Sequence, residues 1–214
     1  MPPTGNSKAP FDRFPDGRGA RHDATAGIAQ VPDGSRVVFV TPALLRALHD
    51  VLDAESPGTW SAIFLGGGTA VGRAFGAAVD RELASRSQPA LTDQPLEICL
   101  TVAERHFAVQ GWGLLTSDVS LAPEHGLVIA RLRQSCAVAA LGRGEDFADA
   151  MLAGFLQGFL EHVSGQQLGC LEIGCARTGM PQCTFVITSA ERLEPVETLV
   201  GLTSPEDIIQ RLKA

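Results

Sequence analysis

The chain has 214 residues, of which 45% are hydrophobic and 19% charged, with a formal net charge of −7. A chain of this length can bury a sizeable core of its own, and its acidic balance argues against a nucleic-acid partner or an anionic membrane surface. Five cysteines in a chain without a recognisable signal peptide favour reduced thiols over disulfides, and no apolar run approaches a membrane span. We therefore expect a soluble cytoplasmic protein.

Residues 1–35 are rich in Pro, Gly, Asp and Arg and show no sustained hydrophobic period. Such a segment buries too little apolar surface to offset the entropy that it loses on ordering. The sequence therefore predicts a disordered N-terminal arm over residues 1–35 and one folded domain over residues 36–214.

The folded domain is expected to begin with a short strand at residues 36–40 and an amphipathic helix. Thr41 and Pro42 supply an N-cap and a first-turn proline, and apolar residues then recur at helical spacing up to the Ser-Pro-Gly turn at residues 56–58. His49 falls among the polar positions of this helix. We interpret it as a solvated histidine.

A second helical stretch, from Trp60 to about Ser87, contains three consecutive glycines at its centre. Their spacing fits neither the dinucleotide-binding nor the P-loop pattern, which argues against nucleotide binding. Gly68, Gly72 and Gly76 instead recur every four residues, as small residues do where a helix or a ligand approaches the backbone closely. Consecutive glycines also weaken a helix, so a break near Gly66 is expected.

The middle of the chain indicates strands. Every second residue from Leu96 to Val102 is apolar, and residues 127–132 form a further apolar run. Trp112 lies between two glycines, where its ring either plugs the core or forms the wall of a ligand cavity. His106 and His125 have no partner at metal-ligand spacing and are interpreted as ordinary polar residues.

The clearest helical pattern runs from about Asp146 to Val163. Gly154 and Gly158 add a groove to this helix, for which packing against another helix or a dimer seam is the preferred interpretation and an apolar ligand the alternative. One wide face carries seven large apolar residues: Met151, Leu152, Phe155, Leu156, Phe159, Leu160 and Val163.

Two strand-like runs, residues 168–175 and 183–188, flank a Thr-Gly-Met-Pro-Gln turn and predict a β-hairpin. The hairpin would bring Cys175 and Cys183 together. Side chains alternate along a strand, so Cys175 would point away from Glu172 unless a bulge at Gly174 resets the alternation.

These thiols and the carboxylate are accepted zinc ligands, and Cys170 is a further donor on the same hairpin. Free cysteines are also among the most buried residue types and behave as small hydrophobes. From the residues alone, a zinc site and a set of buried structural thiols both remain open.

The order Glu172-x-x-Cys175-x-x-x-Gly179-x-x-Gln182-Cys183 resembles the C-terminal signature of the 4-vinyl-reductase domain family. The resemblance covers about residues 39–189. It implies a structural zinc, because the matching Glu and two Cys positions bind zinc in the aromatic-sensing bacterial activators of this family.

In those activators a further cysteine at the start of the preceding long helix completes the zinc site. In this chain that position falls on Asp149, which replaces a thiolate by a carboxylate and lowers the expected affinity. Cys170 is the alternative fourth ligand. An acidic residue in the first turn of a helix, favoured by the helix dipole, is an equally good interpretation of Asp149.

The expected fold is α+β, with an antiparallel sheet of four to five strands packed with helices. The resemblance implies the fold shared by NO-signalling and vesicle-tethering subunits, and a homodimer. It also makes residues 36–214 a ligand-binding domain with an apolar pocket for a hydrocarbon, an aromatic or a tetrapyrrole-like molecule. The residues expected near this pocket are Phe64, Phe107, Trp112, Met151, Phe155 and Phe159.

The role expected from this resemblance is that of a stand-alone sensor or carrier that acts through a separate signalling or pathway protein. One alternative is an accessory subunit of a tetrapyrrole 4-vinyl reductase in bacteriochlorophyll synthesis, although neither a dinucleotide fingerprint nor a flavin site is visible in the sequence. The other is an oligomeric scaffold subunit without a ligand. A large cavity would favour the binder, and a filled core with an exposed apolar patch would favour the scaffold.

Overall fold

A computed structural model of the chain describes residues 21–30 and 36–214. It forms two units, one that ends at Val40 and one from Thr41 to Ala214. In the first unit, strands β1 (Arg21–Asp23) and β2 (Ile28–Gln30) pair antiparallel. This hairpin lies within the segment for which the sequence predicts disorder, so residues 21–30 depart from that prediction.

The carboxylate of Asp23 explains the turn of this hairpin, because it accepts hydrogen bonds from the backbone N–H groups of Thr25 and Ala26. The predicted strand at residues 36–40 is wrong, since only Arg36 forms a bridge, to Gln30. The remaining residues of the predicted arm lie outside the described part of the chain, and the division into an arm and a ligand-binding domain stays a prediction.

The second unit begins with helix α1 (Pro42–Glu55), which confirms the predicted helix. The side chain of Thr41 accepts the N–H of Leu44 at 3.2 Å, as an N-cap residue does. The interpretation of His49 as solvated is wrong. Its side chain is buried between α1 and the residues that follow, and its ring meets the indole of Trp60 edge-on at 5.1 Å.

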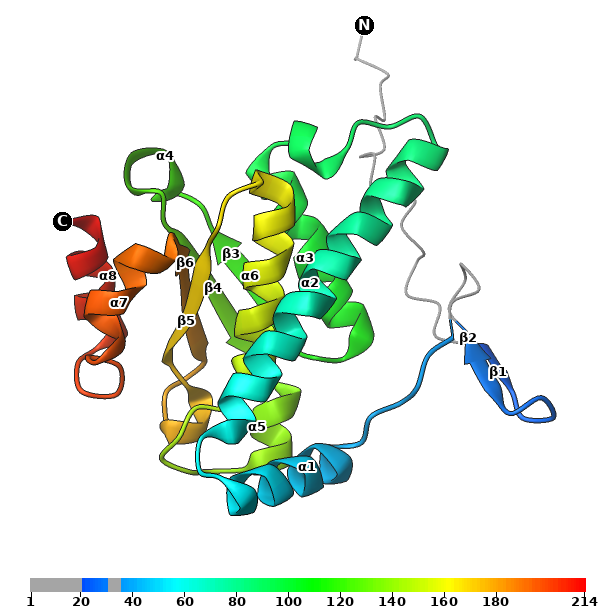
Figure 1. The fold of residues 1–214 in the computed structure, drawn as a ribbon, viewed down its shortest axis with the longest axis horizontal. Coiled ribbons are helices and arrows are strands. Elements are labelled where there is room, and N and C mark those ends of the chain that lie inside the picture. The colour runs from blue at the N-terminus through cyan, green and yellow to red at the C-terminus, as the bar shows by residue number, and fades with distance from the viewer. Residues whose placement is uncertain (1–20, 31–35) are drawn as a thin grey trace, which may run out of the picture. The chain divides into compact units, whose positions relative to one another are not determined.

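Helices α2 (Thr59–Ser85) and α6 (Ala150–Ser164) lie side by side with their backbones in contact (Figure 1). A Cβ atom on Gly72 would lie 2.2 Å from the carbonyl oxygen of Phe155, and one on Gly158 would lie 2.0 Å from that of Thr69. The predicted close helix packing is therefore confirmed. The predicted break near Gly66 is wrong, because tertiary packing offsets the poor helix propensity of glycine.

Among the described residues, α2 alone is long and apolar enough to cross a membrane, with a mean hydropathy of 1.3 over 18 residues, of which 22% are buried. The sequence pattern had not indicated such a run. Core helices meet the same two criteria of length and composition, and one face of α2 is packed against α6. The criteria therefore do not assign a membrane span.

Helix α3 (Leu96–Gln110) stands where the sequence predicted a strand, so that prediction is wrong. Its buried residues Cys99, Ala103 and Phe107 follow one another at intervals of four. This helical period extends over the whole segment, whereas the alternation that suggested a strand spans only seven residues. Gly111 ends the helix in the left-handed conformation, with φ of 76°.

Four strands form one antiparallel sheet in the order β3-β4-β6-β5, which confirms the predicted α+β fold. Their bounds are Leu114–Asp118 for β3, Val128–Arg133 for β4, Gly169–Gly174 for β5 and Cys183–Thr188 for β6. Shorter helical segments are η1 (Leu91–Asp93), α4 (Ala122–His125), α5 (Cys136–Leu141) and η2 (Ala176–Thr178).

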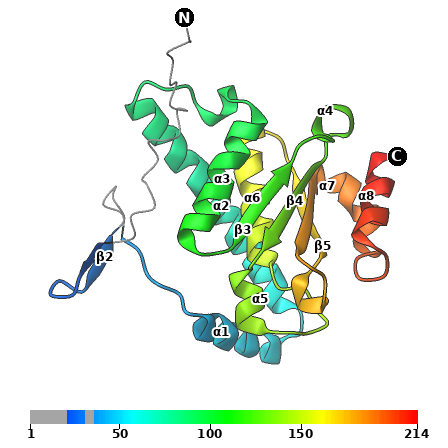
Figure 2. The ribbon, with the colours of Figure 1, turned by 180° about the vertical axis from the view of Figure 1, so that it is seen from behind.

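The two faces of the sheet are covered by different helices. Helix α6 packs on one face, and α7 (Ala190–Glu197) and α8 (Pro205–Lys213) pack on the other (Figures 1 and 2). The second face is filled by a cluster of buried apolar side chains: Leu127, Ile129, Ile173, Val186, Leu193, Val196, Ile208 and Leu212. The alternate residues of β5 and β6 therefore face the start of α6.

The α2–α6 contact makes a prediction about stability. Gly72→Ala places a methyl group against the carbonyl oxygen of Phe155, so the free energy of unfolding should fall by about 1–3 kcal/mol or more, as in overpacked cores. Gly67→Ala on the same helix is the matched control. A Cβ atom there meets nothing within 4 Å, so this variant should gain about 0.5–1 kcal/mol. Chemical denaturation measures both, and equal stabilities would contradict the backbone contact.

Candidate functional site

The β5–β6 hairpin brings Glu172, Cys175 and Cys183 together. The pairing of the two strands shifts register between Glu172 and Gly174, which is the bulge that strand alternation required. The chain then turns through η2 and Gly179, whose φ of 100° is left-handed, and returns to Cys183. The sulfur atoms of Cys175 and Cys183 lie 3.8 Å apart.

Asp149 reaches the same place from the other side. Helix α6 begins at Ala150, four residues later than predicted, so Asp149 precedes the helix and is not a first-turn residue. Its side chain accepts a hydrogen bond from the hydroxyl of Ser135 at 2.6 Å. Its backbone N–H donates to the carboxylate of Glu172 at 3.0 Å. These contacts hold the start of α6 against the hairpin.

One donor atom from each of Asp149, Glu172, Cys175 and Cys183 lies within 4.8 Å of the other three, and all four residues are buried. We call these four residues the donor cluster. Cys170, the alternative fourth ligand, is not part of it. Two carboxylates and two thiolates at this spacing match the ligand types and the number that a tetrahedral zinc ion takes.

The protonation of the donor cluster reflects the burial of several acids together. Burial, reinforced by the charge of Asp149, raises the pKa of Glu172 well above its usual value, and burial also raises the pKa of Asp149. The thiol of Cys183 donates to the sulfur of Cys175, which raises the pKa of Cys183 and lowers that of Cys175 to about 6. One thiolate is thus favoured even without a cation.

Two carboxylate oxygens of the donor cluster, Oδ2 of Asp149 and Oε1 of Glu172, are buried and have no hydrogen-bond partner in the described part of the chain. A buried polar atom without a partner is costly and rare in native proteins. A bound cation would satisfy both oxygens. The unpartnered oxygens and the donor types together fit a divalent metal ion.

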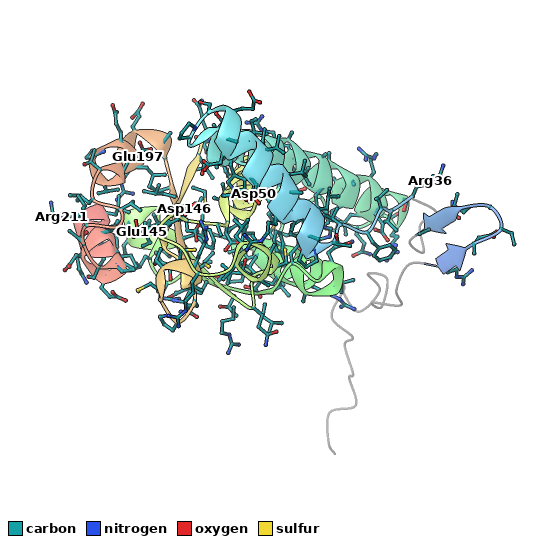
Figure 3. The ribbon with its side chains drawn as sticks, turned by 90° about the horizontal axis from the view of Figure 1, so that it is seen from below. Arg36, Asp50, Glu145, Asp146, Glu197 and Arg211 are labelled. Carbon is teal, nitrogen blue, oxygen red and sulfur yellow. The ribbon has the colours of Figure 1, made fainter. Side chains whose placement is uncertain are left out.

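The loop before Asp149 is fixed from two sides (Figure 3). Arg177, in the hairpin turn, forms an ion pair with Asp146 and donates to the carbonyl oxygen of Gly142 at 3.1 Å. Nε2 of His49 in α1 lies 3.8 Å from the carboxylate of Asp146. The hairpin turn and α1 therefore both set the path by which the chain reaches the donor cluster.

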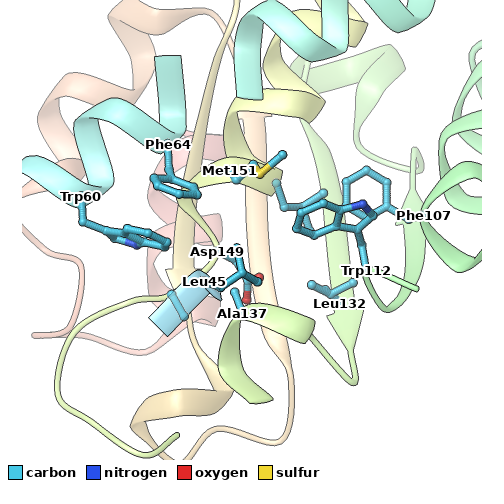
Figure 4. A pocket seen from close by; sticks show the side chains of 11 residues that line it. Leu45, Trp60, Phe64, Phe107, Trp112, Leu132, Ala137, Asp149 and Met151 are labelled. Carbon is cyan, nitrogen blue, oxygen red and sulfur yellow. The ribbon is translucent and has the colours of Figure 1, made fainter. Parts of the chain in front are cut away.

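A cavity of about 20 Å³ lies beside the donor cluster (Figure 4). This volume is about that of one water molecule. Trp60 and Phe64 form one side of it and Phe107 and Trp112 the other (Figure 4). Asp149 belongs both to the donor cluster and to the lining, whose residues are Leu45, Trp60, Phe64, Phe107, Trp112, Leu132, Ala137, Ala148, Asp149, Met151 and Leu152.

Four of the six residues expected near a pocket line this cavity, namely Phe64, Phe107, Trp112 and Met151. The other two, Phe155 and Phe159, do not line it. Their rings pack in an adjacent aromatic group with Phe75, with centroids 5.5 and 5.7 Å from that ring. Whether any of the six contacts a ligand stays a prediction.

Two residues of this region were missed from the sequence. Trp60 precedes Phe64 by four residues on α2, so the helical period would have placed both on one face. His106 was interpreted as an ordinary polar residue, which is wrong. Its ring stacks parallel to that of Phe155 at 5.6 Å, and burial lowers its pKa to about 4, so that it is neutral near pH 7.

Comparisons with known proteins agree with this geometry. Residues 128–189, which include the hairpin, match the family model of the 4-vinyl-reductase domain. No curated protein sequence matches the chain. The phenol-responsive sensory domain of the transcription activator PoxR, solved with phenol, is similar over 87% of this chain and 92% of that domain, at 19% identity and a TM-score of 0.62. At that identity the likeness shows the fold alone.

Two further solved structures are less similar. A vinyl-4-reductase family protein from Methanocaldococcus jannaschii matches 53% of this chain and 76% of its own, at 17% identity and a TM-score of 0.37. A trafficking protein particle complex subunit 3 from Naegleria fowleri, covalently bound to palmitic acid, matches 69% and 93%, at 13% identity and a TM-score of 0.44. The family resemblance and fold class predicted from the sequence are confirmed.

Proposed function

The chain contains a 4-vinyl-reductase domain at residues 128–189, and we propose that it is a small-molecule-binding protein whose hairpin is held by a structural zinc ion. The observation that carries this proposal is the cavity with aromatic walls beside the donor cluster. The PoxR domain, which has the same fold, was solved with phenol. The ligand that we propose for this chain is a small aromatic or other apolar molecule.

The cavity in its present form is smaller than such a ligand. Met151 lines it and is only partly buried, and an unbranched methionine side chain can change rotamer at little cost. Trp112, also half-buried, forms another part of the wall. Rearrangement of these two side chains is the step by which the proposed ligand would gain room.

Zinc would be held by Asp149, Glu172, Cys175 and Cys183. Four protein ligands leave no open position, so the role of the metal would be structural. It would tie the start of α6 to the hairpin and thereby fix Ala148 and Leu152, which line the cavity. Zinc sites of this kind contribute their binding free energy directly to folding.

The zinc proposal predicts one metal ion per chain in protein purified without chelator and supplied with zinc. Cys175→Ser removes a thiolate from the donor cluster and should lose the metal, and it should melt at a lower temperature than the zinc-loaded wild type. Cys136→Ser is the matched control, because Cys136 lies outside the donor cluster. Native mass spectrometry and thermal melting provide the measurements. Full zinc occupancy of Cys175→Ser would overturn the assignment.

The ligand proposal predicts a saturable response of tryptophan emission to phenol. The chain has two tryptophans and no tyrosine, and both tryptophans line the cavity, so emission reports on the cavity itself. Ala137→Leu fills the cavity and should abolish the response. Ala139→Leu, on the exposed side of the same helix, should retain it. A linear, non-saturating response of the wild type would contradict the proposal for this ligand.

A second candidate function is that of an oligomeric scaffold, and one observation favours it. Leu44, Leu48 and Val51 on α1 and Ile63 and Val71 on α2 are at least 43% exposed. Apolar surface of this kind marks protein interfaces. We propose it as the surface of the homodimer that the family resemblance implies. A reductase accessory subunit, a separate signalling partner and a cytoplasmic location stay predictions.

The dimer proposal is tested by sedimentation velocity. Val71→Asp should shift the wild-type dimer to monomer, because it buries an unpaired charge in the interface. Glu191→Gln is a control on the opposite side of the sheet, where α7 lies. A monomeric wild type would contradict the proposal, as would a Val71→Asp protein that remains dimeric.

A further inference from the structure

We infer that Trp60 selects the ligand of the cavity by donating its indole N–H to a neutral hydrogen-bond acceptor. This inference rests on the proposed ligand-binding function and makes the ligand class narrower. The expected ligand is a mostly apolar molecule with a carbonyl, ether or hydroxyl oxygen. Neither a plain hydrocarbon nor an anion meets this requirement.

The first observation concerns the nitrogen of Trp60. The residue is 4% exposed, and its Nε1 is buried without a hydrogen-bond partner among the described residues. Buried indole N–H groups usually find an acceptor, because a donor that has lost its water is otherwise unfavourable. The indole lines the cavity, so an acceptor placed in the cavity is within the reach of this donor.

The second observation is that the indole is held in place. Its ring stacks on that of Phe64, with centroids 3.5 Å apart and planes at 28°. The ring of His49 meets it edge-on at 5.1 Å and 65°. With neighbours on the face and at the edge, the indole cannot turn to find another acceptor, so its direction is fixed before a ligand arrives. A donor fixed in this way discriminates better than a mobile one.

The third observation is the charge of the lining. Its eleven residues include one charged side chain, Asp149, and none of them is Lys, Arg or His. An anionic ligand would therefore be buried beside a carboxylate without a compensating cation, which is strongly unfavourable. Sites that hydrogen-bond a ligand also discriminate against analogues that lack the bonding atom. The lining thus favours neutral ligands with an acceptor.

The test compares three probes of similar shape with zinc-supplied wild-type protein. Acetophenone carries a carbonyl acceptor, α-methylstyrene replaces that oxygen by a CH₂ group, and benzoate is an anion. Calorimetric titration should show acetophenone binding and no binding of benzoate. In Trp60→Phe, the ratio of the acetophenone affinity to the α-methylstyrene affinity should fall about three- to tenfold, the range for one neutral hydrogen bond. The ratio cancels changes in packing that affect both probes alike.

Trp112→Phe is the matched control, because it replaces the indole of the opposite wall (Figure 4). This variant should leave the affinity ratio unchanged. It also keeps one indole N–H resonance, that of Trp60, since the chain has two tryptophans. In nitrogen-edited NMR spectra, acetophenone should move this resonance downfield and α-methylstyrene should not. This measurement does not depend on the folding of Trp60→Phe.

The outcomes separate the inference from the function on which it rests. If neither neutral probe binds to the wild type, the ligand-binding proposal fails for this class of molecule and the inference falls with it. If both bind, but the affinity ratio in Trp60→Phe equals that of the wild type, the role of Trp60 alone is overturned. Tight binding of benzoate would also overturn it. A ratio that falls only in Trp60→Phe, together with the downfield shift, supports it.

Discussion

The contact between the backbones of α2 and α6 determines where the walls of the cavity stand. Glycines on each helix face carbonyl oxygens of the other, with Gly68 against Met151 and Gly154 against Leu65. Because no side chain separates the helices, the first turns of α2 lie directly beside the first turns of α6. Trp60 and Phe64 are thereby set opposite Met151 and Leu152, and the cavity forms between them.

The second constraint is the burial of four acidic groups at the start of α6. Asp149, Glu172, Cys175 and Cys183 come from two segments that are distant in sequence, and the sheet and the α5–α6 loop bring them within one ligand sphere. Backbone and hydroxyl donors already satisfy some of their atoms. The atoms without partners are the ones that face each other, which is the arrangement expected around a cation.

Local patterns in the sequence predicted the elements that depend on local signals. The hairpin, the bulge at Gly174, the Thr41 cap and the glycine packing of α2 all follow from turn chemistry, strand alternation or helical spacing. Helix α3 was mistaken for a strand because seven alternating residues can fit either period. The helix became evident only over the longer interval from Cys99 to Phe107.

The errors at the site have a common physical origin. His49 and His106 lie at helix positions that look polar in sequence, yet each is buried by an aromatic ring from another helix, Trp60 in one case and Phe75 and Phe155 in the other. A contact between distant segments leaves no local period to detect. The same applies to Trp60, whose neighbours in the cavity come from six other segments of the chain.

The segment that carries Trp112 has a consequence for kinetics. The α2–α6 contact contains no side chain that can rotate aside, so separating these helices would break backbone packing along the whole seam. Trp112, in contrast, follows a helix end at Gly111 and is only half-buried. For a molecule held in the cavity, the residence time would therefore be set by how often the Trp112 segment moves, and affinity and exchange rate would be governed by opposite walls.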